Sequence, residues 1–270
     1  MLAEGIPSCG AWTKAEMTSA MNTRQILTLF LGTALLASCG DGKDAASREN
    51  GFENTAVADP AARYRSMPEK ELIDLAFKAA FNTPGHADMT VGDTRYAFTP
   101  QAVRWVGNRA VLISGGQSDN CHGCAGTLAV HYLEPRGNGL AVVGAWPEAA
   151  SGTSYGQPPE WTLRTDLASN PVLQTEGGGT FQGYSCTNAQ LVELTPAAPV
   201  TIADNVQLHF SNEGAVVDGG AESIDGKIMP GARDQNFTVS YGGTTSAQIV
   251  YKRQGTRFEK ATGAPDIPSC

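Results

Sequence analysis

The sequence has few charged residues and no cluster of basic ones. Only 17% of its 270 residues are Asp, Glu, Lys or Arg, and the formal net charge is −8 at pH 7. A negatively charged protein repels phosphate backbones, and no run of Lys and Arg offsets that charge locally. We therefore expect no nucleic-acid partner.

Apolar runs long enough to cross a membrane are also missing near the start. The run over residues 26–38 is shorter than the roughly 20 residues that a spanning helix needs. A short basic segment containing Arg24 precedes it, and small residues end it, which is typical of a secretory signal peptide. The pattern predicts export, with a signal peptide over residues 21–38.

The end of this run, Leu36-Ala37-Ser38-Cys39, resembles the lipobox of bacterial lipoproteins, in which leucine and two small residues precede an obligatory cysteine. The resemblance implies a diacylglyceryl group on the sulfur of Cys39, with fatty acids such as palmitate, and cleavage after Ser38. Two or three acyl chains, at ~0.8 kcal/mol per buried methylene, hold a protein firmly on a membrane. The alternative is an ordinary signal peptide whose Cys39 forms a disulfide.

The residue after Cys39 is relevant to whether a lipoprotein stays in the inner membrane or is moved to the outer membrane. In enteric bacteria an aspartate there often retains a lipoprotein in the inner membrane, whereas this chain has Gly40. The resemblance thus implies an outer-membrane lipoprotein facing the periplasm, whose partner through the lipid anchor is the membrane. Residues 1–20 precede a better start at Met21, and we interpret them as a start codon assigned too early, so that Cys9 is absent from the cell.

Residues 39–65 contain almost no large apolar side chains and cannot offset the entropy of ordering, so we expect a flexible tether there. A β-rich periplasmic domain follows over residues 66–270. Its first segment, Ser66-Met67-Pro68-Glu69, has the spacing of a capping box, and Asn82-Thr83-Pro84-Gly85 is a stop signal. Between them, apolar residues recur at helical spacing: Leu72, Ile73, Ala76, Phe77, Ala80 and Phe81. This predicts one amphipathic helix over residues 67–81, packed on the protein's own sheet.

Beyond Gly92, short alternating segments separated by turn residues predict strands, and 31 glycines and 15 prolines agree with many turns. Gly107-Asn108 suits a tight hairpin between residues 102–106 and 110–114. Leu128, Val130 and Tyr132 would share one strand face, which places His131 on the opposite face. We expect most of the four histidines on the surface or in loops: His86, His122, His131 and His209.

A weak internal repeat places similar strands at residues 111–116, 172–178 and 237–243. Three copies would not close a propeller ring. The predicted fold class is therefore all-β, a sandwich or an open barrel-like stack of hairpins with one N-terminal helix, and a blade-like arrangement is the alternative.

With Cys39 and Cys9 set aside, four of the six cysteines remain: Cys121, Cys124, Cys186 and Cys270. An even set in an oxidising compartment predicts two disulfides, and four cysteines allow three pairings. We favour Cys121 with Cys124, which closes a local loop, and Cys186 with Cys270.

The motif Cys121-His122-Gly123-Cys124 could also belong to a redox-active dithiol or to a metal site. A thioredoxin-type dithiol needs a helix after its first cysteine, but residues 125–130 continue as a turn and a strand. A zinc site could combine Cys121, Cys124, His122 and Cys186, or Cys270 in place of His122, but the second close ligand pair of a zinc knuckle is missing. We expect no cofactor and no metal, and keep this ligand set as the alternative.

Two further patterns bear on function. Gly152-Thr153-Ser154-Tyr155-Gly156 matches the glycine-x-serine-x-glycine string of serine hydrolases, but Gln157-Pro158-Pro159 forbids the helix that the motif requires, so we expect a glycine-rich loop. Several aromatic residues could stack on a sugar ring, although core packing explains most of them: Trp105, Trp146, Trp161, Tyr155 and Tyr184.

No catalytic residue is predicted. The sequence favours a non-enzymatic envelope lipoprotein that binds an envelope protein or a glycan, with an envelope redox or metal-binding protein as the alternative.

Overall fold

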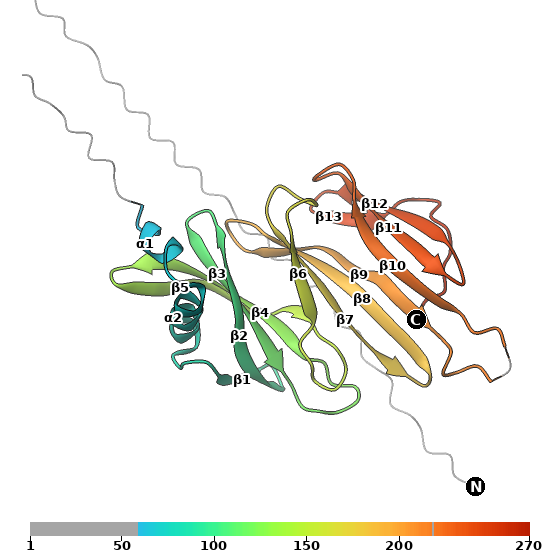
Figure 1. Cartoon of the computed structure of the whole chain (residues 1–270), viewed down its shortest axis with the longest axis horizontal. Helices are drawn as coiled ribbons and strands as arrows, with labels where there is room; N and C mark the ends of the chain where they lie inside the picture. Colours follow the sequence, from blue (N-terminus) through green and yellow to red (C-terminus); the bar gives the residue numbers. More distant parts are fainter. Residues whose placement is uncertain (1–58, 218) are drawn as a thin grey trace, which may run out of the picture. The chain divides into compact units, whose positions relative to one another are not determined.

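The computed structural model describes residues 59–217 and 219–270, which belong to one compact unit, Ala56–Cys270. Four predicted features concern residues outside the described ranges: the start extension, the signal peptide, the lipidation of Cys39 and most of the tether. The described residues form two helices and thirteen strands (Figure 1). In chain order these are α1 (Ala62–Arg65), α2 (Glu69–Phe81), β1 (Ala87–Val91), β2 (Thr94–Val106), β3 (Arg109–Gln117), β4 (Thr127–Arg136), β5 (Gly139–Ser151), β6 (Glu160–Arg164), β7 (Val172–Phe181), β8 (Tyr184–Leu194), β9 (Pro199–Ser211), β10 (Ser223–Pro230), β11 (Asn236–Gly243), β12 (Ala247–Gln254) and β13 (Arg257–Lys260).

The strands form two antiparallel sheets in which neighbours along the chain pair with each other. One sheet has the order β1-β2-β3-β4-β5, and the other has the order β13-β12-β11-β10-β9-β8-β7-β6. Gly107 and Asn108 form the predicted two-residue turn, with Val106 opposite Arg109 and a φ of 56° at Gly107. The predicted all-β fold class is confirmed.

Side-chain alternation along β4 buries both faces of the five-stranded sheet. One face of β4 packs against Leu173 and Val192 of the eight-stranded sheet, and its residues there are Leu128, Val130 and Tyr132. His131 lies on the opposite face, as predicted, where its ring packs 4.8 Å from that of Phe81. It is buried rather than at the surface, and burial lowers its pKa to about 4.

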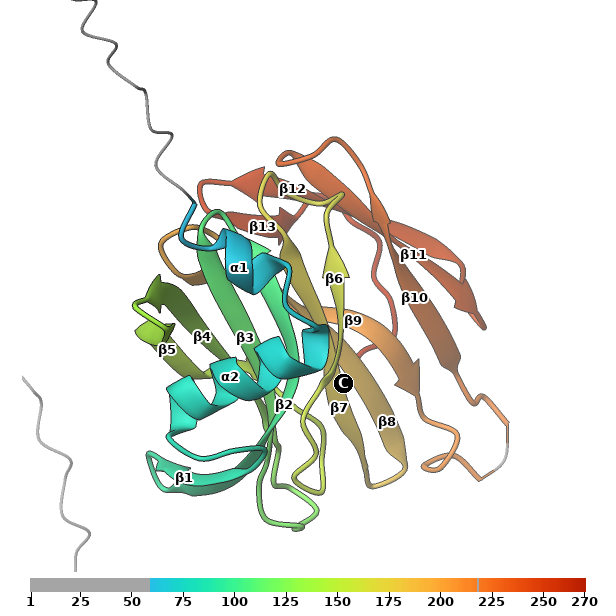
Figure 2. The same cartoon turned by 60° about the vertical axis from the view of Figure 1, so that its left-hand side comes forward.

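Helix α2 covers the face of the five-stranded sheet that turns away from the other sheet (Figure 2). It ends as predicted, because Asn82 adopts a left-handed conformation and its N–H donates to the carbonyl of Lys78. The predicted capping box is wrong. Ser66 instead ends α1, its hydroxyl donating to the carbonyl of Arg63, and α2 begins after Pro68. Neither described helix is long and apolar enough to cross a membrane.

Residues 59–65, which the sequence assigns to the tether, are folded. The buried Tyr64 donates its hydroxyl to the carbonyl of Gly139 at 2.7 Å, and the guanidinium of Arg65 lies 4.8 Å from the ring centre of Trp105. The tether prediction is wrong for this stretch, because two large side chains find partners on the sheet that composition alone does not reveal.

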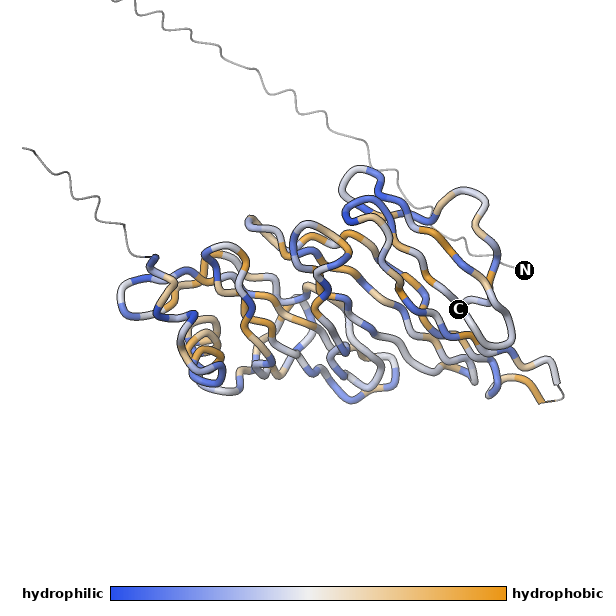
Figure 3. Tube along the Cα trace, turned by 45° about the horizontal axis from the view of Figure 1, so that its top comes forward, coloured by the Kyte–Doolittle hydropathy of each residue, from blue (hydrophilic) through white to orange (hydrophobic). Residues whose placement is uncertain are grey.

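The eight-stranded sheet curls around its own core. β13 contacts β9 as well as its neighbour β12, and the enclosed apolar cluster draws on strands from β7 to β13. Figure 3 shows apolar segments along these strands and hydrophilic segments in the loops. The three segments of the weak internal repeat fall on the hairpins β3–β4, β7–β8 and β11–β12.

A buried ion pair joins two strands of this sheet that are not neighbours. Arg253 on β12 donates to the carboxylate of Glu193 on β8 at 3.2 Å, and Asn170 donates to the same carboxylate at 2.8 Å. Glu193 is buried, so the loss of either partner would leave a buried polar group with fewer hydrogen bonds.

Candidate binding site at the glycine loop

The structure contains two disulfides, Cys121 with Cys124 and Cys186 with Cys270, which is the pairing favoured from the sequence. Their Cα atoms are 5.1 and 6.4 Å apart. Zinc ligation uses thiolates, whereas these four sulfurs are paired in two disulfides. Within the described ranges, no three metal-ligating side chains cluster. After Cys124 the chain turns into β4, so no helix begins at this motif.

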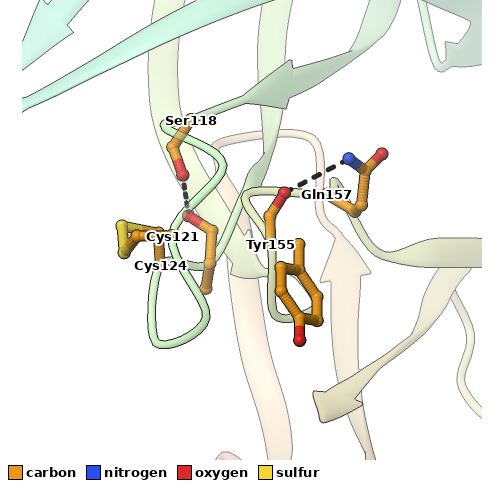
Figure 4. Close-up of a disulfide and its surroundings, with 6 residues drawn as sticks. Ser118, Cys121, Cys124, Tyr155 and Gln157 are labelled. Atoms are coloured by element: carbon orange, nitrogen blue, oxygen red, sulfur yellow. Dashed lines mark hydrogen bonds between the residues drawn. A yellow bond between two sulfur atoms is a disulfide. The ribbon is translucent and has the colours of Figure 1, made fainter.

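Two loops lie against each other near the first disulfide. We call residues 118–126 the disulfide loop and residues 152–157 the glycine loop. The N–H of Gly156 donates to the carbonyl of Cys124 at 2.9 Å, and the N–H of Ser118 donates to the carbonyl of Gly156 at 2.9 Å. Figure 4 shows the disulfide and Tyr155 on these neighbouring loops. Because the bonds join backbone atoms, each loop fixes the position of the other.

Tyr155 occupies an uncommon backbone conformation at the tip of the glycine loop. Its φ is 61°, a left-handed value that is costly for a large side chain, and its side chain is half exposed. Such strain, on the order of 1–3 kcal/mol, persists only where surrounding contacts determine it, and it concentrates at functional sites. The hydrogen bonds to the disulfide loop supply those contacts and hold an aromatic ring toward solvent.

The glycine loop also caps one edge of β7. β6 pairs with β7 only as far as Glu160 opposite Glu176, because Pro158 and Pro159 precede β6. Beyond that point the N–H of Ser154 donates to the carbonyl of Gly178 at 2.8 Å. A Cβ at Gly177 would lie 2.5 Å from the carbonyl oxygen of Gly152, so this approach requires glycine.

Three rings from three segments form an aromatic stack, which we define as Tyr155, His122 and Phe181. The ring centre of His122 lies 5.1 Å from that of Tyr155 and 4.7 Å from that of Phe181, with interplanar angles of 24° and 22°. His122 Nε2 donates to the carbonyl of Thr180 at 2.7 Å, which orients the middle ring. Tyr155 and Phe181 are 50% and 48% exposed, so apolar ring surface is available to a ligand.

A pocket of about 480 Å³ adjoins the stack, with Tyr155 in its wall. Its floor is one face of β6–β8, where Glu160 lies opposite Glu176 and Thr180 lies opposite Ser185. Hydroxyl side chains supply much of the remaining lining: Thr153, Ser154, Thr180, Ser185 and Thr187. Among the residues that the structure describes, the lining includes no Lys or Arg. We call this cavity the hydroxyl pocket.

The two glutamates that line the hydroxyl pocket are cross-strand neighbours of the same formal charge. Carboxylates directly opposite each other on adjacent strands destabilise a sheet. Glu176 accepts a hydrogen bond from Gln174 at 2.9 Å, but neither carboxylate forms an ion pair with any residue in the described ranges. Gln174 in turn accepts a hydrogen bond from Arg164 at 2.7 Å, so only Glu176 of the two is linked to a cation, and only indirectly. A locally unfavourable arrangement of this kind is expected at functional sites.

No family model, no curated protein and no solved structure matches the chain. The chemistry of the site therefore follows from its own residues. Ser154 is succeeded by a turn and then β6, so the strand-to-helix elbow of a serine hydrolase is not formed. The exposed rings, hydroxyls and carboxylates form a surface suited to recognition.

The structure brings only one of the five sequence-predicted aromatics, Tyr155, into this site. Trp105 packs under Arg65, Trp146 packs 5.2 Å from Tyr132, the indole N–H of Trp161 donates to Gln101, and Tyr184 lies 6.3 Å from Phe210. The sequence reasoning missed Phe181, Glu160 and Glu176. Only the alignment of β6, β7 and β8 places them beside Tyr155.

Proposed function

We propose that this chain is a lipid-anchored protein of the bacterial cell envelope, held in the outer membrane and facing the periplasm, whose β-domain is a non-catalytic binding module. The lipobox at Cys39 supports the anchor, and the two disulfides suit an oxidising compartment. The anchor keeps the domain at the membrane surface, where envelope proteins and glycans are its accessible partners.

The strained, half-exposed Tyr155 is the observation that carries the binding role. A ring fixed in place before a ligand arrives avoids the entropy of ordering that a mobile side chain loses on binding. The disulfide loop serves this role by fixing the glycine loop, which accounts for Cys121 and Cys124 without a redox reaction.

Replacing Cys39 with Ser tests the anchor. Because the acyl chains attach through its sulfur, Cys39→Ser should move the protein from the membrane fraction to the soluble periplasmic fraction, measured by fractionation and intact mass. The Cys121→Ser/Cys124→Ser double variant, which loses two cysteines but keeps Cys39, is the control and should leave the protein on the membrane. Membrane association of the Cys39→Ser protein would contradict the anchor.

An envelope redox protein is the second candidate, favoured by the close spacing of Cys121 and Cys124 in a surface loop beside His122. We expect the purified protein to show no free thiols at rest and no catalysis of insulin disulfide reduction in the presence of a dithiol. Catalysis that disappears in a Cys121→Ser/Cys124→Ser double variant would favour the redox function instead.

A further inference from the structure

We propose that the hydroxyl pocket and the aromatic stack together bind a neutral saccharide. The proposal rests on the binding function given above and assigns its ligand class. Three features carry it: exposed ring faces, a dense set of hydroxyl and carboxylate groups, and a pocket lining whose described residues include no basic one.

The stack provides an apolar platform of fixed orientation. One face of a pyranose ring is lined by C–H groups, and such a face packs against an aromatic ring while the hydroxyls at its rim stay free to hydrogen bond. The backbone of Gly156, next to Tyr155, is hydrogen-bonded to the disulfide loop, and the ring of His122 is held by the carbonyl of Thr180. The sugar therefore meets surface that does not need to be ordered on binding.

The pocket supplies partners for the sugar's hydroxyls. A carboxylate accepts hydrogen bonds at both oxygens, so Glu160 and Glu176 can each receive two neighbouring hydroxyls of one ring. Threonine and serine hydroxyls both donate and accept, which suits the same property of sugar hydroxyls. Thr180 and Ser185 are already 3.1 Å apart and share a hydrogen bond on the pocket floor.

The charge of the site selects among saccharides. Glu160 and Glu176 lie opposite each other, and no Lys or Arg in the described part of the chain lines the pocket to balance them. A uronic acid or a phosphorylated sugar would bring a third negative charge into this environment. The site therefore favours neutral sugars over acidic ones, and a basic peptide is the competing ligand class that the same charge would attract.

The test is a calorimetric titration of the detergent-solubilised full chain with defined sugars. The neutral probes are maltohexaose, cellohexaose and the hexamer of N-acetylglucosamine, and the acidic probe is oligogalacturonate. We expect at least one neutral probe to bind, and oligogalacturonate to bind at least tenfold more weakly.

Three variants locate the binding. Tyr155→Ala should weaken the neutral sugar about tenfold through loss of the stacked ring, whereas Tyr155→Phe should retain most of the affinity. Glu176→Gln should reduce the difference in affinity between the neutral and the acidic probes, because it removes one negative charge that repels the acidic sugar. Met229→Ala is the control, since Met229 is 44% exposed on β10 and lies outside the pocket lining, and it should bind like the parent.

The proposal is overturned if no neutral probe binds, or if Tyr155→Ala and Met229→Ala bind equally well. Binding of a lysine-rich peptide that Tyr155→Ala and Glu176→Gln both weaken, without sugar binding, would also overturn it, while leaving the binding module intact. The anchor is measured separately by the fractionation of Cys39→Ser, so each idea can fail alone.

Discussion

The first and second halves of β7 show how one strand serves both the core and a surface site. Residues 172–175 are buried, and Leu173 lies in the cluster between the two sheets. Residues 177–179 are three glycines without side chains, and they are followed by the half-exposed Phe181. Packing of the first half fixes the strand, and the missing side chains of the second half leave space for the glycine loop and the hydroxyl pocket.

Replacing Leu173 with Ala should give the largest loss of stability. The side chain is fully buried, so the variant loses apolar burial and leaves a cavity, with an expected cost of about 4 kcal/mol in the free energy of unfolding. Urea denaturation measures it. Phe181→Ala, at the other end of the strand, should change stability by less than about 1 kcal/mol. Equal losses in the two variants would remove the contrast between the two halves.

Arg253→Met should lower the free energy of unfolding by about 3 kcal/mol, because it leaves the buried carboxylate of Glu193 with Asn170 as its remaining partner. Glu193 is on β8, directly opposite Val172 of β7. Arg257→Met, on the neighbouring strand β13 and exposed, is the control and should change the free energy of unfolding by less than about 0.5 kcal/mol. A similar small effect for both variants would show that the core half of β7 does not depend on this ion pair.

Acid should weaken the core through His131. Its pKa in the folded state, about 4, lies below the unfolded value of 6.5, so the unfolded chain takes up the proton first as pH falls. The contribution is complete above pH 6.5 and is lost toward pH 4, which amounts to about 2 kcal/mol between pH 7 and pH 5. His131→Leu should reduce the pH dependence of the free energy of unfolding between pH 7 and pH 5. An unchanged slope in that variant would assign the acid sensitivity to other groups.

Gly177→Ala should have a small effect on stability and a larger one on the site. The added methyl meets the carbonyl of Gly152, so the glycine loop has to shift, at a cost of about 1 kcal/mol. Sugar affinity should fall with it, measured in the same titration. Gly242→Ala is the control, because a Cβ there has open space around it, and both properties should stay close to those of the parent.

The sequence predicted those features that local patterns determine. The spacing of apolar residues predicted α2, and Asn82 marked its end. The alternation along β4 predicted that the side chains of His131 and Val130 lie on opposite faces of the sheet. The capping-box prediction at Ser66 was wrong because spacing alone cannot show that a helix precedes the serine. Ser66 ends α1, and α1 is held in place by the hydrogen bond from Tyr64 to the carbonyl of Gly139.

The candidate site was harder to predict because its parts are distant in the chain. Tyr155 belongs to a motif that the sequence shows, but Phe181 joins it only once β7 and β8 form a hairpin. The meeting of Glu160 and Glu176 depends on the register of β6, and a shift by one residue would move one carboxylate to the other face.

The disulfide between Cys186 and Cys270 spans a sequence separation of 84 and encloses β9 to β13. A protease that cuts the chain once between β9 and β10 would therefore not release a fragment. Both pieces would migrate together on a denaturing gel and separate only after reduction, so intact size under non-reducing conditions is no proof of an uncut backbone.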